Sequence, residues 1–181
     1  MVPEAPLEET EAGRVPKGDG WYVLNAKEAR WLHADGRDAV CDLEGDVDFS
    51  QLGVNIRVLE PGQPMAMYHW EADQEDFLVL SGEALLLVEG EERPLRTWDF
   101  VHCPPETKHV LIGAGSGPCV VLAVGARDRS VDNPDWGGYP VDEVALRHRA
   151  GVERETSEPR EAYAGLKRRQ PTRYRDGWLD A

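Results

Sequence analysis

The sequence predicts an all-β fold, an antiparallel sandwich or barrel, and three observations lead to this prediction. Between residues 39 and 126, short apolar runs recur about every ten residues. Turn-forming pairs separate the runs, as at Pro61-Gly62, Ser81-Gly82 and Pro104-Pro105. No part of this segment keeps a helical period. Evenly spaced short strands without intervening helices are typical of sandwiches and barrels.

Two segments precede the β pattern. Residues 1–20 contain Pro, Glu and Gly with little hydrophobic material, which predicts a mobile N-terminal arm. Residues 21–25 (WYVLN) are a short strand candidate. Asn25 with Glu28 three residues later has the pattern of a capping box, so a short helix is expected over residues 26–32 (AKEARWL).

The β segment itself divides into eight expected strands. They are residues 39–43, 52–59, 65–71, 77–80, 84–88, 100–103, 109–113 and 119–124. Within LGVNIRVL (52–59), Asn55 and Arg57 lie on the parity opposite to the apolar side chains. Residues 89–94 (EGEERP) are interpreted as a turn. We therefore assign residues 21–126 to one β-barrel domain with a short N-terminal strand and helix.

Residues 127–181 are expected to form a helical extension of this domain. A segment rich in Pro, Gly and Asp leads to two helices, one over residues 141–149 (VDEVALRHR). The other has Pro159 in its first turn and runs through residues 160–169 (REAYAGLKRR). Both helices are expected to cover the outside of the barrel.

The end of the chain, residues 167–181, is called the basic strap below. It holds five basic side chains followed by Trp178 and Leu179. One interpretation is a solvated helix end, where cations suit the helix dipole. The other is a strap that lies across the acidic core or across a partner subunit. The sequence leaves both open.

Charge and composition limit the classes of partner. Lysine and arginine total 20 against 34 acidic residues, for a net charge of −14. This balance argues against nucleic acid or a membrane surface as the main partner, because binding to phosphates needs clustered cations. No apolar run approaches the roughly 20 residues that span a bilayer, and the N-terminus does not read as a signal peptide. Three cysteines without metal-ligand spacing predict reduced thiols in the cytoplasm.

The candidate chemistry begins in MAMYHWE (65–71). If this segment is extended, Met65, Met67, His69 and Glu71 share one face, because side chains alternate with period two. Residues two apart on a strand are separated by about 6.8 Å, so two of these side chains can reach one ion. His69 and Glu71 are therefore candidate ligands, and the two methionines are expected to line a cavity.

Two further polar residues stand among apolar neighbours. Glu75 lies on the parity of Phe77 and Val79, and a carboxylate among core residues must be paired, protonated or metal-bound. His109 opens an apolar run after the double-proline turn. Two imidazoles and two carboxylates that converge inside a barrel form a site for a first-row transition metal.

At this point the segment 62–113 resembles the two signature motifs of the cupin superfamily. The first motif reads G-x5-H-x-H-x3/4-E-x6-G. His69, Glu75 and Gly82 hold their places in it, and Glu71 stands where the second histidine would be. The turn after Gly62 is one residue longer than the motif prescribes.

The second motif, G-x5-P-x-G-x2-H-x3-N, is matched less closely. Pro104 and His109 hold their places. Trp98 and Glu106 replace the two glycines of the motif, and Gly113 replaces the closing asparagine. The resemblance covers residues 50–125 and leaves out both ends of the chain.

The resemblance implies a small jelly-roll-like antiparallel β-barrel, usually a homodimer, with a metal inside. Carried over by position, the implied ligands are His69, Glu75 and His109, with Glu71 in place of a histidine. A second carboxylate favours one divalent ion of Fe, Mn, Ni or Zn over Cu(I). Alternatively, Glu71 turns outward and pairs with an arginine.

Several neighbouring residues have a structural interpretation and a functional one. His102 is expected either to point outward or to lie behind the ligands, in preference to being a fifth ligand. Cys103 fits a buried, inert cysteine better than a reactive thiol. Tyr68, Trp70 and Trp98 are expected on the outer face of a sheet, where aromatic residues also suit a dimer interface.

Two classes of function follow. The first is a metal-dependent enzyme that acts on a small organic molecule inside the barrel, by oxygenase or isomerase chemistry. The second is a non-catalytic protein that holds a small ligand, with or without a metal. The barrel alone does not decide between them, since one fold supports many activities.

Overall fold

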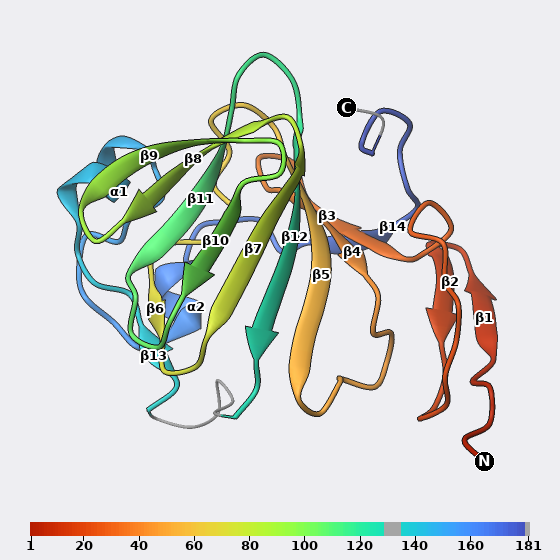
Figure 1. Cartoon of the computed structure of the whole chain (residues 1–181). Helices are drawn as coiled ribbons and strands as arrows, with labels where there is room; N and C mark the ends of the chain where they lie inside the picture. The colour runs from red at the N-terminus through yellow and green to blue at the C-terminus, as the bar shows by residue number, and fades with distance from the viewer. Residues whose placement is uncertain (129–134, 180–181) are drawn as a thin grey trace.

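The computed structural model describes residues 1–128 and 135–179, and it has the antiparallel β architecture that the sequence predicts. Strands dominate, and they form two main sheets (Figure 1). The larger sheet has the strand order β10-β7-β12-β5-β4-β3-β14. Its strands are β3 (Trp31–His33), β4 (Ala39–Asp42), β5 (Leu52–Leu59), β7 (Glu75–Ser81), β10 (Phe100–Cys103), β12 (Cys119–Ala126) and β14 (Gln170–Thr172).

The smaller sheet has the order β11-β8-β9 and lies beside β10 and β7 in Figure 1. Its strands are β8 (Glu83–Val88), β9 (Glu91–Arg96) and β11 (His109–Ala114). A short two-stranded sheet, β6 (Trp70–Glu71) with β13 (Gly137–Gly138), links the barrel to the C-terminal segment. All these pairings are antiparallel, as in Val121 of β12 opposite Arg57 of β5.

The main core takes side chains from both sheets. The larger sheet gives it Leu59, Phe77, Val79, Val101, Cys103, Val121 and Ala123, and the smaller sheet gives Ala84, Leu86 and Leu111. The opposite face of the larger sheet is also covered, because Val58 and Val120 pack there with Trp31, Cys41 and Trp178. The larger sheet is therefore buried on both faces at β5 and β12, whereas the outer face of β10 is exposed.

The strands predicted from residue 39 onward are found, with two differences. Of residues 65–71 only Trp70 and Glu71 form a strand, while His69 and Pro64 make single bridges to His109 and Ile112. The Tyr68 N–H donates instead to the carbonyl of Ala150 in the C-terminal segment (2.6 Å).

The second difference is β9, because the interpretation of residues 89–94 as a turn is wrong. The turn consists of Glu89 and Gly90 only, both with positive φ (48° and 80°), as a tight hairpin requires. Residues 91–96 then pair with β8. The strand lies at the edge of its sheet and is mostly exposed, so Pro94 is tolerated there.

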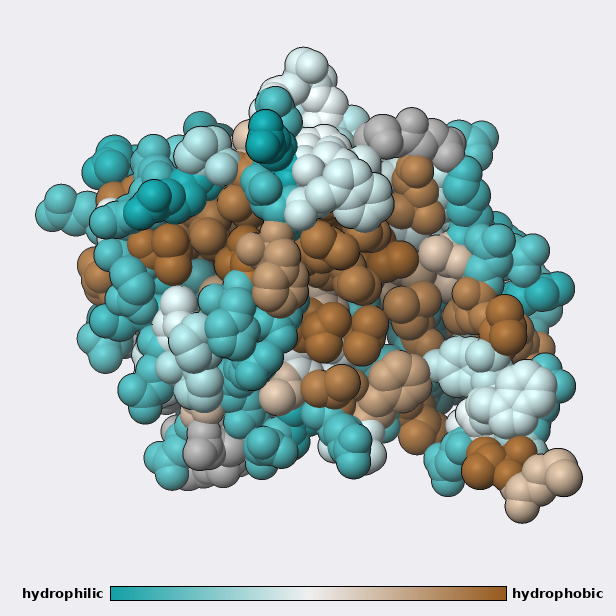
Figure 2. All heavy atoms as spheres, in the orientation of Figure 1, coloured by the Kyte–Doolittle hydropathy of each residue, from teal (hydrophilic) through white to brown (hydrophobic). Residues whose placement is uncertain are grey.

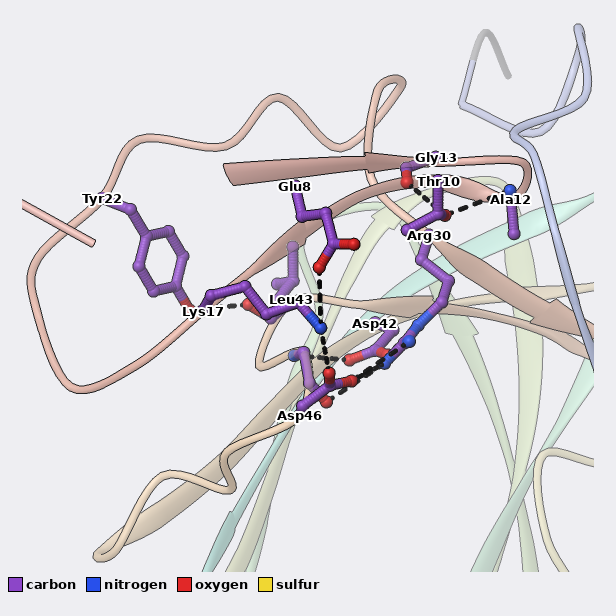
Figure 3. A network of polar contacts seen from close by, with 11 residues as sticks. Glu8, Thr10, Ala12, Gly13, Lys17, Tyr22, Arg30, Asp42, Leu43 and Asp46 are labelled. Atoms are coloured by element: carbon purple, nitrogen blue, oxygen red, sulfur yellow. Dashed lines mark hydrogen bonds and ion pairs between the residues drawn. The ribbon is translucent and has the colours of Figure 1, made fainter. Parts of the chain in front are cut away.

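The N-terminal arm is also different from the prediction. Residues 1–20 contain a β-hairpin, β1 (Leu7–Thr10) with β2 (Gly13–Pro16), in place of a segment without structure. Lys17 binds the carboxylates of Glu8 (3.0 Å) and Asp46 (Figure 3). Val15 is buried, and this burial together with the ion pairs holds the hairpin against the domain.

The strand expected at residues 21–25 does not form, since Trp21 makes only a single bridge to Glu4. The helix predicted at residues 26–32 is also absent, and β3 takes part of its place. The Asn25 side chain does cap a turn, since its Oδ1 accepts from the N–H of Lys27 (2.9 Å). The chain then leaves the turn, because Ala29 bridges Arg14 of the hairpin and Trp31 enters the larger sheet. Tertiary pairing thus overrides the local helix signal.

Both predicted C-terminal helices are shorter than expected. The first, α1 (Glu143–Arg147), is capped at its N-terminus by Asp142, whose side chain accepts from the N–H of Ala145 (2.8 Å). The second, α2 (Pro159–Ala162), has only four residues. Gly165 then adopts a positive φ of 85°, which turns the chain toward β14.

The basic strap lies on the chain's own larger sheet over its described residues, 167–179. Strand β14 pairs with β3, and Lys167 and Arg173 form ion pairs with Asp35 and Glu9, both at 3.0 Å. The rings of Trp178 and Trp31 are 4.9 Å apart. This arrangement corresponds to the strap interpretation and not to a solvated helix end.

The face of the molecule shown in Figure 2 carries a band of hydrophobic residues across its middle, with hydrophilic residues around it. The most exposed large residues near strand β10 are Trp98 (72%) and Phe100 (63%), at the edge of the larger sheet.

Among the described helices, none is long and apolar enough to cross a bilayer.

Candidate metal centre

Two histidines are brought together by backbone pairing. His69 and His109 form an antiparallel bridge, in which the His109 N–H donates to the His69 carbonyl (2.8 Å) and the His69 N–H donates to the His109 carbonyl (3.2 Å). Directly opposed residues place their side chains on the same face. The two imidazole rings are consequently 5.0 Å apart, and both residues are buried.

Glu75 reaches the same point from the larger sheet. It is the first residue of β7, opposite Cys103 of β10 and Gly125 of β12. Its Oε2 lies 3.3 Å from His109 Nε2 and 3.5 Å from His69 Nε2. The three ligand atoms all lie within 4.8 Å of one another.

The tautomer of each histidine is set by the backbone. His69 Nδ1 donates to the carbonyl of Met67 (2.8 Å), and His109 Nδ1 donates to the carbonyl of Thr107 (2.9 Å). A carbonyl oxygen only accepts, so Nδ1 carries the hydrogen in both rings. In the neutral rings, each Nε2 then presents a lone pair toward Glu75, as metal-binding histidines do.

The electrostatics of the group call for a positive charge between these atoms. Burial would raise the pKa of Glu75, but the neighbouring imidazoles of His109 and His69 hold it well below its usual range. Burial would lower the pKa of His109, but Cys103 and Glu75 raise it to about 10. Lone pairs that face a carboxylate repel it unless a proton or a cation lies between them.

Glu71 lies beside the group without belonging to it. Its Oε1 is 3.7 Å from His69 Nε2, and it is not one of the three residues whose ligand atoms converge. Burial and the neighbouring charge of Glu75 raise the pKa of Glu71 to about 7. The structure shows Glu71 facing the same cavity and forming no ion pair with an arginine among the described residues.

The cavity has a volume of about 720 Å³ and lies against the inner face of the larger sheet. Met65 and Phe77 line it as expected, with the Phe77 ring 5.3 Å from His109, and Val79 is buried in the adjoining core. Met67 does not line it: this residue packs outside, with Trp136 and Tyr139. The extended segment that would have pointed Met67 inward does not form.

His102 is not a cavity residue. Its side chain is 52% exposed, and its Nδ1 lies 2.7 Å from Asp76 Oδ1 on the outside of the sheet. The adjacent residue in β10, Cys103, points inward and is buried in the core. Alternation along the strand thus separates the two residues, and it places the histidine away from the candidate metal ligands.

Eight polar residues of the cavity wall were not identified from the sequence. They are Arg37, Asp48, Asn55, Arg57, Arg127, Tyr139, Tyr163 and Arg169. The alternation within residues 52–59 contained a signal for Asn55 and Arg57, because it placed both on one face of β5. Nothing in the sequence pattern indicated the others, since they reach the cavity from segments distant in the chain.

Of the aromatic residues expected on the outer face of a sheet, one is buried and another is exposed. Tyr68 is 1% exposed and packs with Leu87, Val110 and Ala145 of α1. It is therefore not on an open sheet face, and Trp98, although exposed, lies in the turn between β9 and β10. Tyr139 and Tyr163 close the cavity near His69, with the Tyr139 ring 6.0 Å from the His69 ring.

Comparison with known proteins is consistent with this architecture. Residues 55–125 match a family model described as a cupin domain. A solved structure from Silicibacter pomeroyi is described as a sugar phosphate isomerase from a cupin superfamily. It is 31% identical over 51% of this chain and 60% of that chain, with a TM-score of 0.46. The matched region therefore spans less than two thirds of that isomerase.

Two further solved structures share the fold at low identity. A predicted oxalate decarboxylase from Thermotoga maritima is 16% identical, over 58% of this chain and 98% of that chain, with a TM-score of 0.52. An RmlC-like cupin from Shewanella frigidimarina is 13% identical, over 61% of this chain and 95% of that chain, with a TM-score of 0.51. No curated protein matches the sequence.

Proposed function

This chain contains a cupin domain, and on that premise we propose that it is a metal-binding enzyme that acts on a small organic substrate. The reaction is of the oxygenase or isomerase type and takes place in the cavity beside His69, Glu75 and His109. One observation carries the proposal. Two buried histidines, each fixed through Nδ1 to a backbone carbonyl, direct Nε2 at the same carboxylate oxygen.

The residues of the centre fit a metal ion. Glu75 Oε2 and His109 Nε2 are buried and have no hydrogen-bond partner among the described residues. Ligand atoms about 2.1 Å from an ion lie roughly 3.0 Å apart across a right angle and roughly 3.4 Å apart across a tetrahedral angle. The observed separations of 3.3 and 3.5 Å suit such a geometry.

The donor set favours iron, manganese, nickel or zinc, because it combines imidazole nitrogen with carboxylate oxygen. Such an ion would supply Lewis acidity, a template for substrate or activation of oxygen. Glu71 is proposed as a neighbour that adjusts the charge of the site, and as a fourth ligand only if it moves closer than the present 3.7 Å from His69.

The other residues of the cavity would shape and shield the substrate. Met65 and Phe77 give it an apolar floor, and Trp136, Tyr139 and Tyr163 limit the access of water near His69. A concave site in which an apolar floor is combined with converging polar groups is typical of sites for small molecules. A small-molecule substrate fits this cavity better than a polymer would.

A second candidate function is a non-catalytic protein that holds a small ligand. The departures from the second cupin motif favour it, since Trp98, Glu106 and Gly113 replace two glycines and an asparagine. The four polar residues of the predicted metal site would then orient a ligand without turnover. They are His69, Glu71, Glu75 and His109. A cytoplasmic location and a homodimer, for which the exposed Trp98 and Phe100 offer an apolar contact, are further predictions.

Elemental analysis of protein purified without chelator tests the metal site, and about one divalent transition metal per chain is expected. Oxygen uptake by the Fe(II) form, and exchange of solvent hydrogen into small carbonyl and hydroxy compounds, test the two reaction types. Metal without either activity would favour the binding protein. Absence of stoichiometric metal, with unchanged properties in His109→Ala, would overturn both metal-dependent versions.

A further inference from the structure

Three arginines from separate parts of the chain converge on the cavity that holds His69 and Glu75. Arg57 lies on β5, Arg37 precedes β4, and Arg169 precedes β14 in the basic strap. Two of these three lie outside residues 55–125, the segment that matches the cupin domain. In a chain of net charge −14, the grouping sets this part of the cavity apart from the acidic remainder.

One carboxylate, that of Asp38, pairs with two of the three guanidinium groups. Asp38 is 1% exposed, and its Oδ2 accepts from Arg57 Nε (2.6 Å), while its Oδ1 binds Arg169 Nη2. Arg37 donates to the carbonyl of Lys167 (3.4 Å) and lies over the ring of Tyr163, with no carboxylate paired to it in the described part of the chain. The cluster therefore has two positive charges in excess.

These charges are partly removed from water. The side chains of Arg57 and Arg169 are 16% and 18% exposed. Burial lowers the pKa of Arg169, and the positive charges of Arg57 and Arg37 lower it further, against the effect of Asp38. Grouped, half-buried like charges are unfavourable unless an anion joins them.

The cluster also has hydrogen-bond donors to offer. Arg57 uses Nε and Nη2, the latter on the Met65 carbonyl (2.6 Å), and Arg169 uses Nε and Nη2 on Asp38. Each thus keeps Nη1 without a partner among the residues that the structure describes. Guanidinium groups bind carboxylate and phosphate oxygens through such paired N–H groups.

A neighbouring amide points to a ligand as well. Asn55 shares the inward parity of β5 with Arg57, and its Oδ1 is buried without a hydrogen-bond partner among the described residues. A hydroxyl or N–H group of a bound molecule would satisfy it. Arg127 gives a contrast, because it lines the same cavity but is paired with Glu44 at 2.7 and 3.0 Å.

We propose that Arg37, Arg57 and Arg169 form a subsite for the phosphate or carboxylate group of the substrate, in the same cavity as the metal centre. The substrate class is then a small organic anion that carries a hydroxyl or N–H group for Asn55. The role as substrate subsite rests on the proposed function, whereas the binding of an anion there does not.

Calorimetric titration of chelator-treated protein with inorganic phosphate, and separately with succinate, tests the subsite without interference from a metal. The variants are Arg37→Gln, which leaves no carboxylate unpaired, and Arg169→Lys, which keeps a positive charge beside Asp38. Arg173→Gln is the matched control, because Arg173 belongs to the same strap, pairs with Glu9 and does not line the cavity.

We expect one anion per chain for the wild type, a dissociation constant at least about 10-fold higher in Arg37→Gln and Arg169→Lys, and a change of less than about 2-fold in Arg173→Gln. Binding of phosphate alone or of succinate alone supports the subsite and identifies the group it takes. The proposal is overturned if the wild type binds neither probe up to about 10 mM, or if the control loses as much affinity as the cavity variants.

The same titration separates this inference from the proposed function. In His109→Ala, which lacks a proposed metal ligand, binding of the anion is expected to persist. A protein that holds no metal yet binds phosphate through Arg37 would overturn the metal enzyme and leave the anion subsite standing. A protein that holds metal but binds neither probe would overturn the anion subsite and leave the metal enzyme standing.

Discussion

Glu75 and His109 belong to opposite sheets, and their side-chain atoms Oε2 and Nε2 lie 3.3 Å apart inside the molecule. Neither atom has a hydrogen-bond partner among the described residues. Contacts of this kind between a carboxylate and an accepting nitrogen are stable only when a proton or a metal is shared. The strands β7 and β11 thus bring together two candidate ligands from different sheets.

His109→Ala and Glu75→Gln are each expected to reduce bound metal from about one ion per chain to near zero, because each removes one of three converging donors. His102→Ala is the control, since this exposed histidine lies on the outside of β10. Metal content measured by elemental analysis checks the prediction. Full occupancy in both ligand variants would show that the ion binds elsewhere.

Removal of metal by a chelator is expected to lower the melting temperature by about 5–10 °C, since a ligand at a hundred times its dissociation constant contributes about 2.7 kcal/mol. Differential scanning calorimetry before and after dialysis, followed by addition of Zn or Mn, gives the measurement. His109→Ala should show no such shift. An equal shift in that variant would indicate that the chelator acts away from the proposed centre.

Glu71→Gln is expected to keep the metal, with an affinity within about 10-fold of the wild type. The reason is that Glu71 lies 3.7 Å from His69 and outside the group of three donors. Competition with a fluorescent chelator measures the affinity. Loss of the ion in this variant would instead assign Glu71 as a true ligand, as the cupin motif implies by position.

Trp178→Ala is expected to lower the free energy of unfolding by about 3 kcal/mol, because it removes a large buried ring. Trp178 is 8% exposed and its ring lies 4.9 Å from that of Trp31. Urea denaturation followed by circular dichroism measures the change. Trp98→Ala, at a residue 72% exposed, serves for comparison and should stay within about 0.5 kcal/mol. Similar values for both variants would contradict a packed strap.

The thiols are expected to be unreactive in the folded protein at pH 8. Burial raises the pKa of Cys41 to about 12 and that of Cys119 to about 11, so the reactive thiolate is scarce below those values. Cys103 is likewise buried. A colorimetric disulfide reagent should detect no thiol in the native state and three after unfolding in urea. Rapid labelling of native protein would contradict the packing of these residues.

The sequence predicted the β architecture because most strands carry their own apolar runs and turn signals. It identified His69, Glu75 and His109 because three chemically demanding residues stood in an apolar setting with recognisable spacing. It missed β9, whose exposed edge carries no apolar signal, and it placed Met67 inside the cavity on the assumption of an extended segment.

The rest of the site depends on contacts between distant parts of the chain. Asn25 and Glu28 carry a real capping signal, yet the pairing of Ala29 with Arg14 and the entry of Trp31 into the larger sheet replace the helix. Arg37, Tyr163 and Arg169 reach the cavity only after the two ends of the chain have packed against the sheet. Local pattern holds no information on such long-range docking.

The ion pair of Asp38 with Arg169 joins residues 131 positions apart. A ribosome-bound chain that has not yet emerged past the basic strap can form most of β5 and β12, but it leaves Val58 and Val120 without the cover of Trp178. A fragment limited to residues 55–125 would expose that hydrophobic surface and lack part of its cavity wall. Dissection of this protein into modules should therefore keep both termini, or it will yield aggregation in place of a folded domain.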